Sequence, residues 1–126
     1  MPSIRILSVG QCGYDDGKIR RSIKTGLTAE VISVGSHDQA QKLLREERFD
    51  VVLVNRIGDQ DGASGLDLIQ VLKSAATTAS IPCLLVSNLT EAQDAAVSLG
   101  AARGFGKNDL ETKRPVEALM DALAVS

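Results

Sequence analysis

The run Val51-Val52-Leu53-Val54 constrains the fold more than any other stretch of this sequence. A short, valine-rich run without polar alternation predicts a strand buried on both faces, as in a parallel sheet covered by helices. Asn55 ends the run, and a polar, glycine-containing stretch follows over residues 56–65. Because ligands of open α/β sheets bind beyond the carboxyl ends of the strands, Asn55 is the first candidate for a functional residue.

Strand-like and helix-like segments alternate along the rest of the chain. Apolar runs predict strands at residues 4–9, 29–34, 50–55, 83–87 and 101–105, and helical periodicity predicts helices at 18–25, 36–48, 66–74, 90–99 and 115–124. Two of these helices begin with the form of a capping box, Ser36 with Gln39 and Thr90 with Gln93. The alternation predicts one domain over residues 1–126, a doubly wound parallel sheet with helices on both faces.

Charge and hydropathy argue against several classes of function. A net charge of −2 and a pI near 5.3 disfavour generic nucleic-acid binding, which usually needs a basic surface. No apolar run approaches the roughly 20 residues of a membrane span, and the N-terminus lacks a signal-peptide pattern. We therefore expect a soluble, cytoplasmic protein without membrane contacts. Cys12 is expected in a loop and Cys83 in the core, with neither a disulfide nor a metal site.

Five strand–helix units with Asn55 after the third strand, Ser87 after the fourth and Lys107 after the fifth resemble the receiver domain of bacterial response regulators. The resemblance covers essentially the whole chain and rests most on Phe49–Asn55, Ser64–Ile69, Ile81–Ser87 and Leu99–Ala101 with Lys107. It implies a CheY-like, flavodoxin-like fold with five helices and strand order 2-1-3-4-5. In that family an aspartate closing the third strand accepts phosphate from a histidine kinase, and two acidic residues after the first strand hold Mg²⁺. The hydroxyl and the lysine bind the phosphate.

The acceptor and the metal positions depart from this pattern. Asn55 stands where the family has its aspartate, and a neutral amide cannot attack a phosphoryl group. Aligned through the first strand, the metal positions are Gly10 and Gln11; aligned through the next helix, they fall near Tyr14 and Asp15. The loop after the first strand is therefore expected to be about two residues longer than usual, and no metal or cofactor is expected.

Other candidate residues have simpler interpretations. Asp15 and Asp16 are predicted to be acids preceding or entering the first helix, although they remain alternative metal ligands. Lys107 is expected to bond to Asn55 or to carbonyl groups at the strand ends, and Ser87 to satisfy local backbone.

The positions that serve conformational switching in the receiver family also differ in this sequence. Gly104 occupies the position of the family's aromatic switch residue, and Phe105, one place out of register, is expected to pack in the core. Asn108 replaces the usual proline after the lysine. A face formed by the fourth helix, fifth strand and fifth helix is expected to bind a partner; the residues assigned to it are Asn88, Arg103, Phe105 and Asp109.

Three functions are therefore considered. The leading one is a stand-alone pseudo-receiver, not an enzyme, that acts by phosphorylation-independent contact with a histidine kinase or an output protein, as a monomer or weak homodimer. In the second, Asp59 or Asp61 accepts phosphate, with Asp15 or Asp16 helping to hold Mg²⁺. The third is a small nucleotide-binding enzyme using the loop 10–18, which lacks Walker spacing and carries two acids that would repel phosphate.

Overall fold

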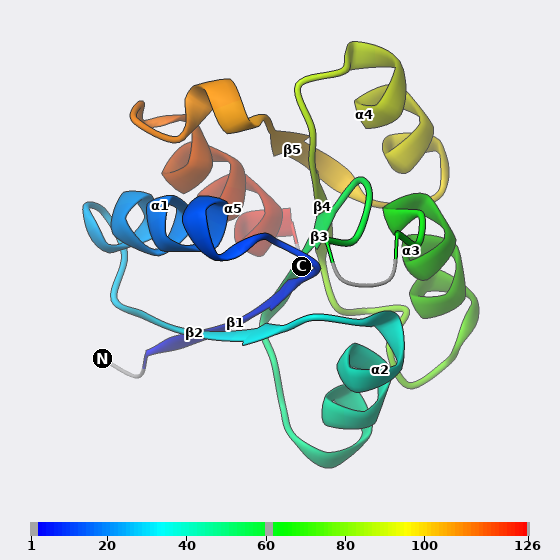
Figure 1. The fold of residues 1–126 in the computed structure, drawn as a ribbon. Coiled ribbons are helices and arrows are strands. Elements are labelled where there is room, and N and C mark those ends of the chain that lie inside the picture. Colours follow the sequence, from blue (N-terminus) through cyan, green and yellow to red (C-terminus); the bar gives the residue numbers. More distant parts are fainter. Residues whose placement is uncertain (1–2, 60–61, 126) are drawn as a thin grey trace.

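A five-stranded parallel sheet forms the centre of the molecule in the computed structural model, which describes residues 3–59 and 62–125 (Figure 1). The strands are β1 (Ile4–Val9), β2 (Ala29–Val34), β3 (Val51–Asn55), β4 (Cys83–Val86) and β5 (Ala102–Phe105). Their order is β2-β1-β3-β4-β5, which confirms the predicted topology and places β3 in the middle.

Helices follow each strand and cover both faces of the sheet. They are α1 (Gly13–Lys24), α2 (His37–Glu46), α3 (Gly65–Ser74), α4 (Thr90–Ser98) and α5 (Arg114–Val125), with a short 3₁₀ helix η1 (Lys107–Asp109) between β5 and α5. In Figure 1, α1 and α5 lie against one face, and α2, α3 and α4 against the other. No helix within the described ranges is long and apolar enough to cross a membrane.

The side chains of β3 alternate between two hydrophobic cores. Val51 and Leu53 pack with α1 and α5, whereas Val52 and Val54 pack with α2, α3 and α4. All four are completely buried. Since burial of each such side chain stabilises the fold by about 1.5–3 kcal/mol, this strand must be apolar on both faces, as the sequence predicts.

Helix α1 begins at Gly13, five residues before the predicted start at Lys18, so that prediction is wrong. Cys12, which was expected in a loop, is the N-cap: its backbone is extended and its Sγ accepts a hydrogen bond from Asp15 N at 3.4 Å. Asp15 and Asp16 fall in the first turn, where negative charge complements the helix dipole. The connection after β1 spans residues 10–12, and the predicted lengthening of this loop relative to the family stays a prediction.

Only one of the two predicted capping boxes forms. Ser36 and Gln39 cap α2 reciprocally, as predicted. Helix α4 has Leu89 as its N-cap and no side-chain cap hydrogen bond, so the box predicted for Thr90 and Gln93 is wrong. Gln93 instead points into the molecule and is 6% exposed.

Gln93 ties α4 to the ends of β4 and β5. Its Nε2 donates to Leu85 O at 2.9 Å and to Ser87 O at 3.1 Å, and its Oε1 accepts from Gly104 N at 3.0 Å. The β4–β5 register shifts here, because Leu84 pairs with Ala102 but Val86 pairs with Phe105. A Cβ at Gly104 would lie 2.1 Å from Leu85 O, so the close approach of the two strands requires glycine.

Candidate functional site

The carboxyl ends of the central strands enclose a hollow of about 290 Å³. Two sequence-predicted residues from neighbouring strand ends, Asn55 and Ser87, line it together with Lys107, which follows β5. The remaining lining residues are Arg56, Ile57, Val86, Asn88 and Leu89. The fold therefore brings the three residues that carry the receiver resemblance to one place.

The Asn55 side chain acts as a clamp between two loops. It is 7% exposed, and its Nδ2 donates to Gly10 O at 3.0 Å and to Ile57 O at 2.6 Å. Carbonyl oxygens only accept hydrogen bonds, so the amide nitrogen must face them. A carboxylate has no hydrogen to offer to either carbonyl, and Asn55 therefore makes contacts that an ionised aspartate could not.

The Gly10 carbonyl is a meeting point of the same two loops. Gly10 has φ +77°, and a Cβ there would lie 3.1 Å from Gly58 Cα. Its oxygen also accepts from Asp59 N at 2.9 Å. The loop after β3 thus docks directly on the loop after β1, with the Asn55 amide beneath the contact. Glycine at position 10 permits both the backbone conformation and the close approach.

Lys107 is paired with an acid, and the predicted bonding to Asn55 or to strand-end carbonyls is wrong. Its Nζ lies 2.9 Å from Asp15 Oδ2, which joins η1 to the first turn of α1. Burial by itself raises the pKa of the Asp15 carboxyl. Hydrogen bonds from Lys107 and Cys12, together with nearby positive charge, outweigh burial and hold that pKa below its ordinary value.

Asp15→Asn is expected to lower the free energy of unfolding by about 1 kcal/mol at pH 7, because the pair is only partly shielded from water. A lowered folded-state pKa means that Asp15 stabilises the fold above about pH 4 and loses this contribution as pH falls through the folded-state value. Urea unfolding at neutral and acidic pH should therefore show the deficit shrinking in acid. Asp121→Asn, on an exposed α5 residue, should show no deficit at either pH. A deficit of equal size at both pH values would contradict the assignment.

Asp16 is directed away from the hollow. Its Oδ1 accepts from Ser8 Oγ at 3.1 Å, and its Oδ2 accepts from Ser33 Oγ at 2.7 Å and Arg20 Nε at 3.0 Å. These contacts fasten α1 to β1 and β2. The side chain of Asp59 is exposed and does not line the hollow, and Asp61 lies outside the described residues.

These acids do not fit a Mg²⁺ site as they are arranged. Magnesium prefers several oxygen ligands in near-octahedral geometry. Asp15 is bound by a lysine, Asp16 by two hydroxyls and an arginine, and Asn55 presents its nitrogen to the loops. Within residues 3–59 and 62–125, no three His, Cys, Asp or Glu side chains are grouped so as to hold a metal ion.

The other predicted site residues make local contacts. Ser87 is 7% exposed and its Oγ accepts from Leu89 N at 3.1 Å, which agrees with the interpretation that it satisfies local backbone. Gln11 Nε2 lies 3.5 Å from Val9 O, and its buried Oε1 has no hydrogen-bond partner in the described part of the chain. Residues 13–18 are helical, so the phosphate-cradling loop of the nucleotide-enzyme hypothesis is absent from this segment.

The residues assigned to a partner face differ in exposure. Asn88 is exposed, and its Oδ1 accepts from the backbone nitrogen of residue 108 at 3.0 Å. Arg103 is exposed and paired with Asp94 on α4. Asp109 is half-buried, and its Oδ2 accepts from the backbone nitrogen of residue 106. Phe105 is 2% exposed; it packs in the core as expected, and its assignment to the face is wrong.

Gln93 and the Asp15–Lys107 pair are the site features that sequence reasoning missed. A signal for Gln93 was present, because it lies three residues before Ala96 and so shares the buried face of α4. No local pattern links Asp15 to Lys107, which are distant in sequence and meet only through the strand order.

The fold of this chain is similar to those of several proteins of known structure. Neither a protein-family model nor a curated protein sequence matches the chain. A protein from Chloroflexus aurantiacus J-10-fl described as a response regulator is 16% identical, with a TM-score of 0.82 over 98% of this chain and 99% of that chain. A sensor protein from Polaromonas sp. JS666 is 18% identical, with a TM-score of 0.80 over 98% of each chain. An orphan response regulator of H. pylori is 19% identical, with a TM-score of 0.74 over 97% of this chain and 99% of that one. At these identities the similarity establishes the fold, which is the CheY-like, flavodoxin-like fold of response-regulator receiver domains.

Proposed function

We propose that this chain is a pseudo-receiver: a receiver-like module of a two-component-type signalling system that binds a protein partner without being phosphorylated at the end of β3. The observation that carries the proposal is the Asn55 amide, whose nitrogen donates to two loop carbonyls where a phospho-acceptor would need a free carboxylate. The likeness of the fold to response regulators supports the signalling part of the proposal.

The groups around Asn55 support the same conclusion. Lys107 would be needed to neutralise an incoming phosphoryl group, but its ammonium already contacts the Asp15 carboxylate. Asp15 would be needed to hold Mg²⁺, and the same ion pair occupies it. An ion pair and an amide clamp therefore replace the charges on which phosphoryl transfer depends, and they hold the loops in one arrangement.

The partner surface in this proposal is the face formed by α4, β5 and α5. A groove of about 490 Å³ lies there, and its lining includes Val97 on α4, Arg103 on β5, and Ala118 and Ala122 on α5. Val97 is 41% exposed, and Met120 on α5 is 54% exposed. The hydrogen bonds of Gln93 tie α4 to the ends of β4 and β5 beside this face. A histidine kinase or an output protein would bind it in our proposal.

Titration of ¹⁵N-labelled protein with Mg²⁺, and then with Mg²⁺ and beryllofluoride as a phosphoryl mimic, tests the proposal. We expect the amide resonances of Asn55, Ser87 and Lys107 to stay in place, because Asn55 offers no carboxylate and Lys107 is already paired with Asp15. Shifts that spread through these three residues would overturn phosphorylation-independent action. Phosphate incorporation that disappears when Asp59 and Asp61 are both changed to asparagine would instead support the displaced-acceptor hypothesis.

A further inference from the structure

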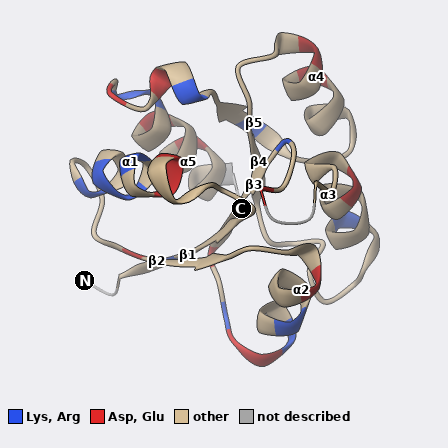
Figure 2. Ribbon diagram, viewed as in Figure 1, with Lys and Arg blue, Asp and Glu red and all other residues tan. Residues whose placement is uncertain are grey.

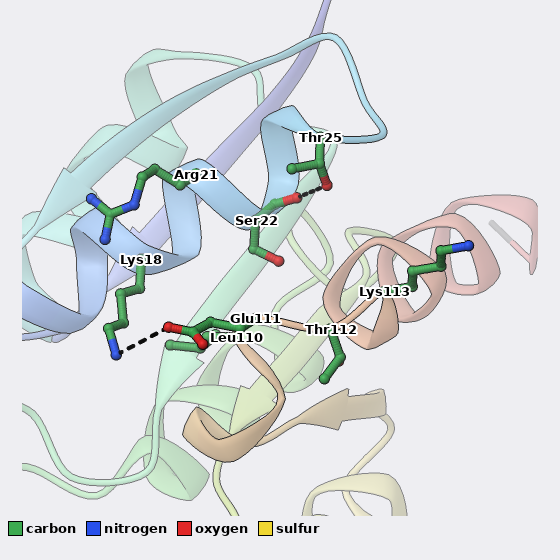
Figure 3. Close-up of a pocket in the computed structure, with 8 residues that line it drawn as sticks. All are labelled: Lys18, Arg21, Ser22, Thr25, Leu110, Glu111, Thr112 and Lys113. Atoms are coloured by element: carbon green, nitrogen blue, oxygen red, sulfur yellow. Dashed lines mark hydrogen bonds and ion pairs between the residues drawn. The ribbon is translucent and has the colours of Figure 1, made fainter.

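A second hollow, of about 360 Å³, lies between α1 and the segment that leads into α5 (Figure 3). Helix α1 contributes Lys18, Arg21 and Ser22, with Thr25 just after it. The opposite wall is the segment 110–113, which consists of Leu110, Glu111, Thr112 and Lys113. None of these residues lines the hollow at Asn55, so the two sites are separate.

The Ser22 hydroxyl is a polar group in the wall of this hollow that has no hydrogen-bond partner among the described residues. The residue is 6% exposed, and its Oγ is buried. Figure 3 shows the hydroxyl pointing from α1 toward the gap in front of residues 110–113. The carbonyl oxygen of Ser22 is already bound by Thr25 Oγ1 at 2.6 Å. Buried hydroxyls are nearly always hydrogen-bonded, and an orphaned one that lines a hollow points to a ligand.

The charge of the lining favours an anion. Three cations, Lys18, Arg21 and Lys113, and one carboxylate, Glu111, line the hollow in a protein whose net charge is −2. In Figure 3, Lys18 is directed toward Glu111, whereas the charged ends of Arg21 and Lys113 point outward from the rim. Figure 2 shows basic positions on α1 and on the connection into α5. No carboxylate of the described residues forms an ion pair with Arg21 or Lys113. The site is therefore a positive region on an acidic molecule.

Glu111 is held weakly in the position that an anion would take. Its Oε1 lies 3.9 Å from Lys18 Nζ, and its side chain is 86% exposed. An exposed pair at this distance contributes little, and the long glutamate side chain can leave the hollow without disturbing the backbone. A stronger anion could displace it from Lys18.

We propose that this hollow binds the phosphate group of a small phosphate monoester. Ser22 Oγ would donate a hydrogen bond to one phosphate oxygen and Lys18 would neutralise part of its charge, while the long side chains of Arg21 and Lys113 would turn inward from the rim to neutralise the rest. Phosphate fits better than a carboxylate, since it carries nearly two negative charges and three acceptor oxygens for these several donors. The hollow is at the small end of the range for ligand pockets and leaves room for a short organic group beside the phosphate.

Amide chemical shifts of ¹⁵N-labelled protein test the proposal with inorganic phosphate, with glycerol 3-phosphate, and with sodium chloride at matched ionic strength. We expect both phosphate compounds to produce saturable shifts in Ser22, Thr25 and residues 110–113, and chloride to produce none. Equal shifts with chloride, or phosphate shifts confined to the hollow at Asn55, would overturn the proposal.

Four single-residue variants test which side chains contribute to phosphate binding. Ser22→Ala is expected to raise the Kd for phosphate about tenfold, since it removes a hydrogen bond to a charged group. It should not lower the melting temperature, because the hydroxyl has no partner within the described protein. Arg21→Gln, at an exposed position, should raise the Kd about fivefold, and Glu111→Gln should lower it by a similar factor.

Lys24→Gln provides the matched control, because Lys24 is an exposed cation of the same helix outside the hollow. It should change the Kd by less than about twofold if attraction is local and screened by salt. The proposal would be refuted if Ser22→Ala and Arg21→Gln both left the affinity for phosphate unchanged, or if Lys24→Gln lowered it equally. Either result would show that phosphate is attracted to α1 in general and does not bind a specific site.

Discussion

Gln93→Leu is expected to lower the free energy of unfolding by about 3 kcal/mol, one of the two largest effects we anticipate for single substitutions in this protein. Leucine has a similar volume but cannot donate to Leu85 O and Ser87 O or accept from Gly104 N. These backbone groups lie in a buried region that water reaches poorly, so each unpaired group costs free energy. The further contact with Phe105 O is long, at 3.5 Å, and adds little.

Urea unfolding followed by circular dichroism measures this loss. Gln70→Leu is the matched control, because Gln70 is exposed on α3 and the same change there should leave the stability within about 0.5 kcal/mol. The amide resonances of Gly104 and Ser87 should also move in Gln93→Leu, since their hydrogen bonds are lost or rearranged. A variant as stable as the wild type would mean that α4 does not depend on Gln93 for its place against β4 and β5.

The strands could be predicted because two-sided burial leaves a strong local signal. Val51 to Val54 face two different cores, so no polar residue is tolerated along the run, and the strand is visible without any alignment. The Ser36 capping box was equally readable, because both of its hydrogen bonds lie within four residues. The strand and the capping box could be predicted because each depends on residues that are close together in the sequence.

The start of α1 could not be predicted because its local signals disagree with the tertiary structure. Gly13 and Gly17 have low helix propensity, and cysteine is an uncommon N-cap. Packing of Ile19 and Ile23 into the core and the bonds from Asp16 to β1 and β2 override those propensities. Long-range contacts of this kind decide the boundary.

Asn55, Ser87 and Lys107 lie together at the strand ends as the sequence predicts, but the bonding among the residues there was not predicted. Strand order places Lys107 beside the first turn of α1, where the Asp15 carboxylate attracts it more strongly than neutral carbonyl groups do. The role of Gln93 was missed because a box-like sequence suggested a competing local explanation. In both cases the deciding partners come from distant strands.

Asn55→Asp is expected to lower the free energy of unfolding by about 3 kcal/mol at pH 7, although it supplies the residue that receiver domains use as phospho-acceptor. The new carboxylate would face Gly10 O and Ile57 O, which accept hydrogen bonds and repel negative charge. Both donations would be lost at a position that is 7% exposed. Asn88→Asp is the control: the exposed Asn88 side chain accepts through Oδ1, and a carboxylate preserves that contact.

The pH dependence separates repulsion at this position from a general loss of packing. Burial against two carbonyl oxygens raises the folded-state pKa of the introduced carboxyl above its ordinary value near 3.9. The folded variant then binds more protons than its unfolded chain, so its free energy of unfolding falls as pH rises from about 4 toward the folded-state value. The deficit relative to the wild type should therefore be smallest in acid, where the neutral carboxyl can donate to one carbonyl, and largest at neutral pH. The Asp15 contribution acts in both proteins and cancels in the difference. A deficit independent of pH, or none at all, would show that Asn55 does not clamp the two loops. The expected result would mean that the Asn55 amide is part of what holds the strand ends together.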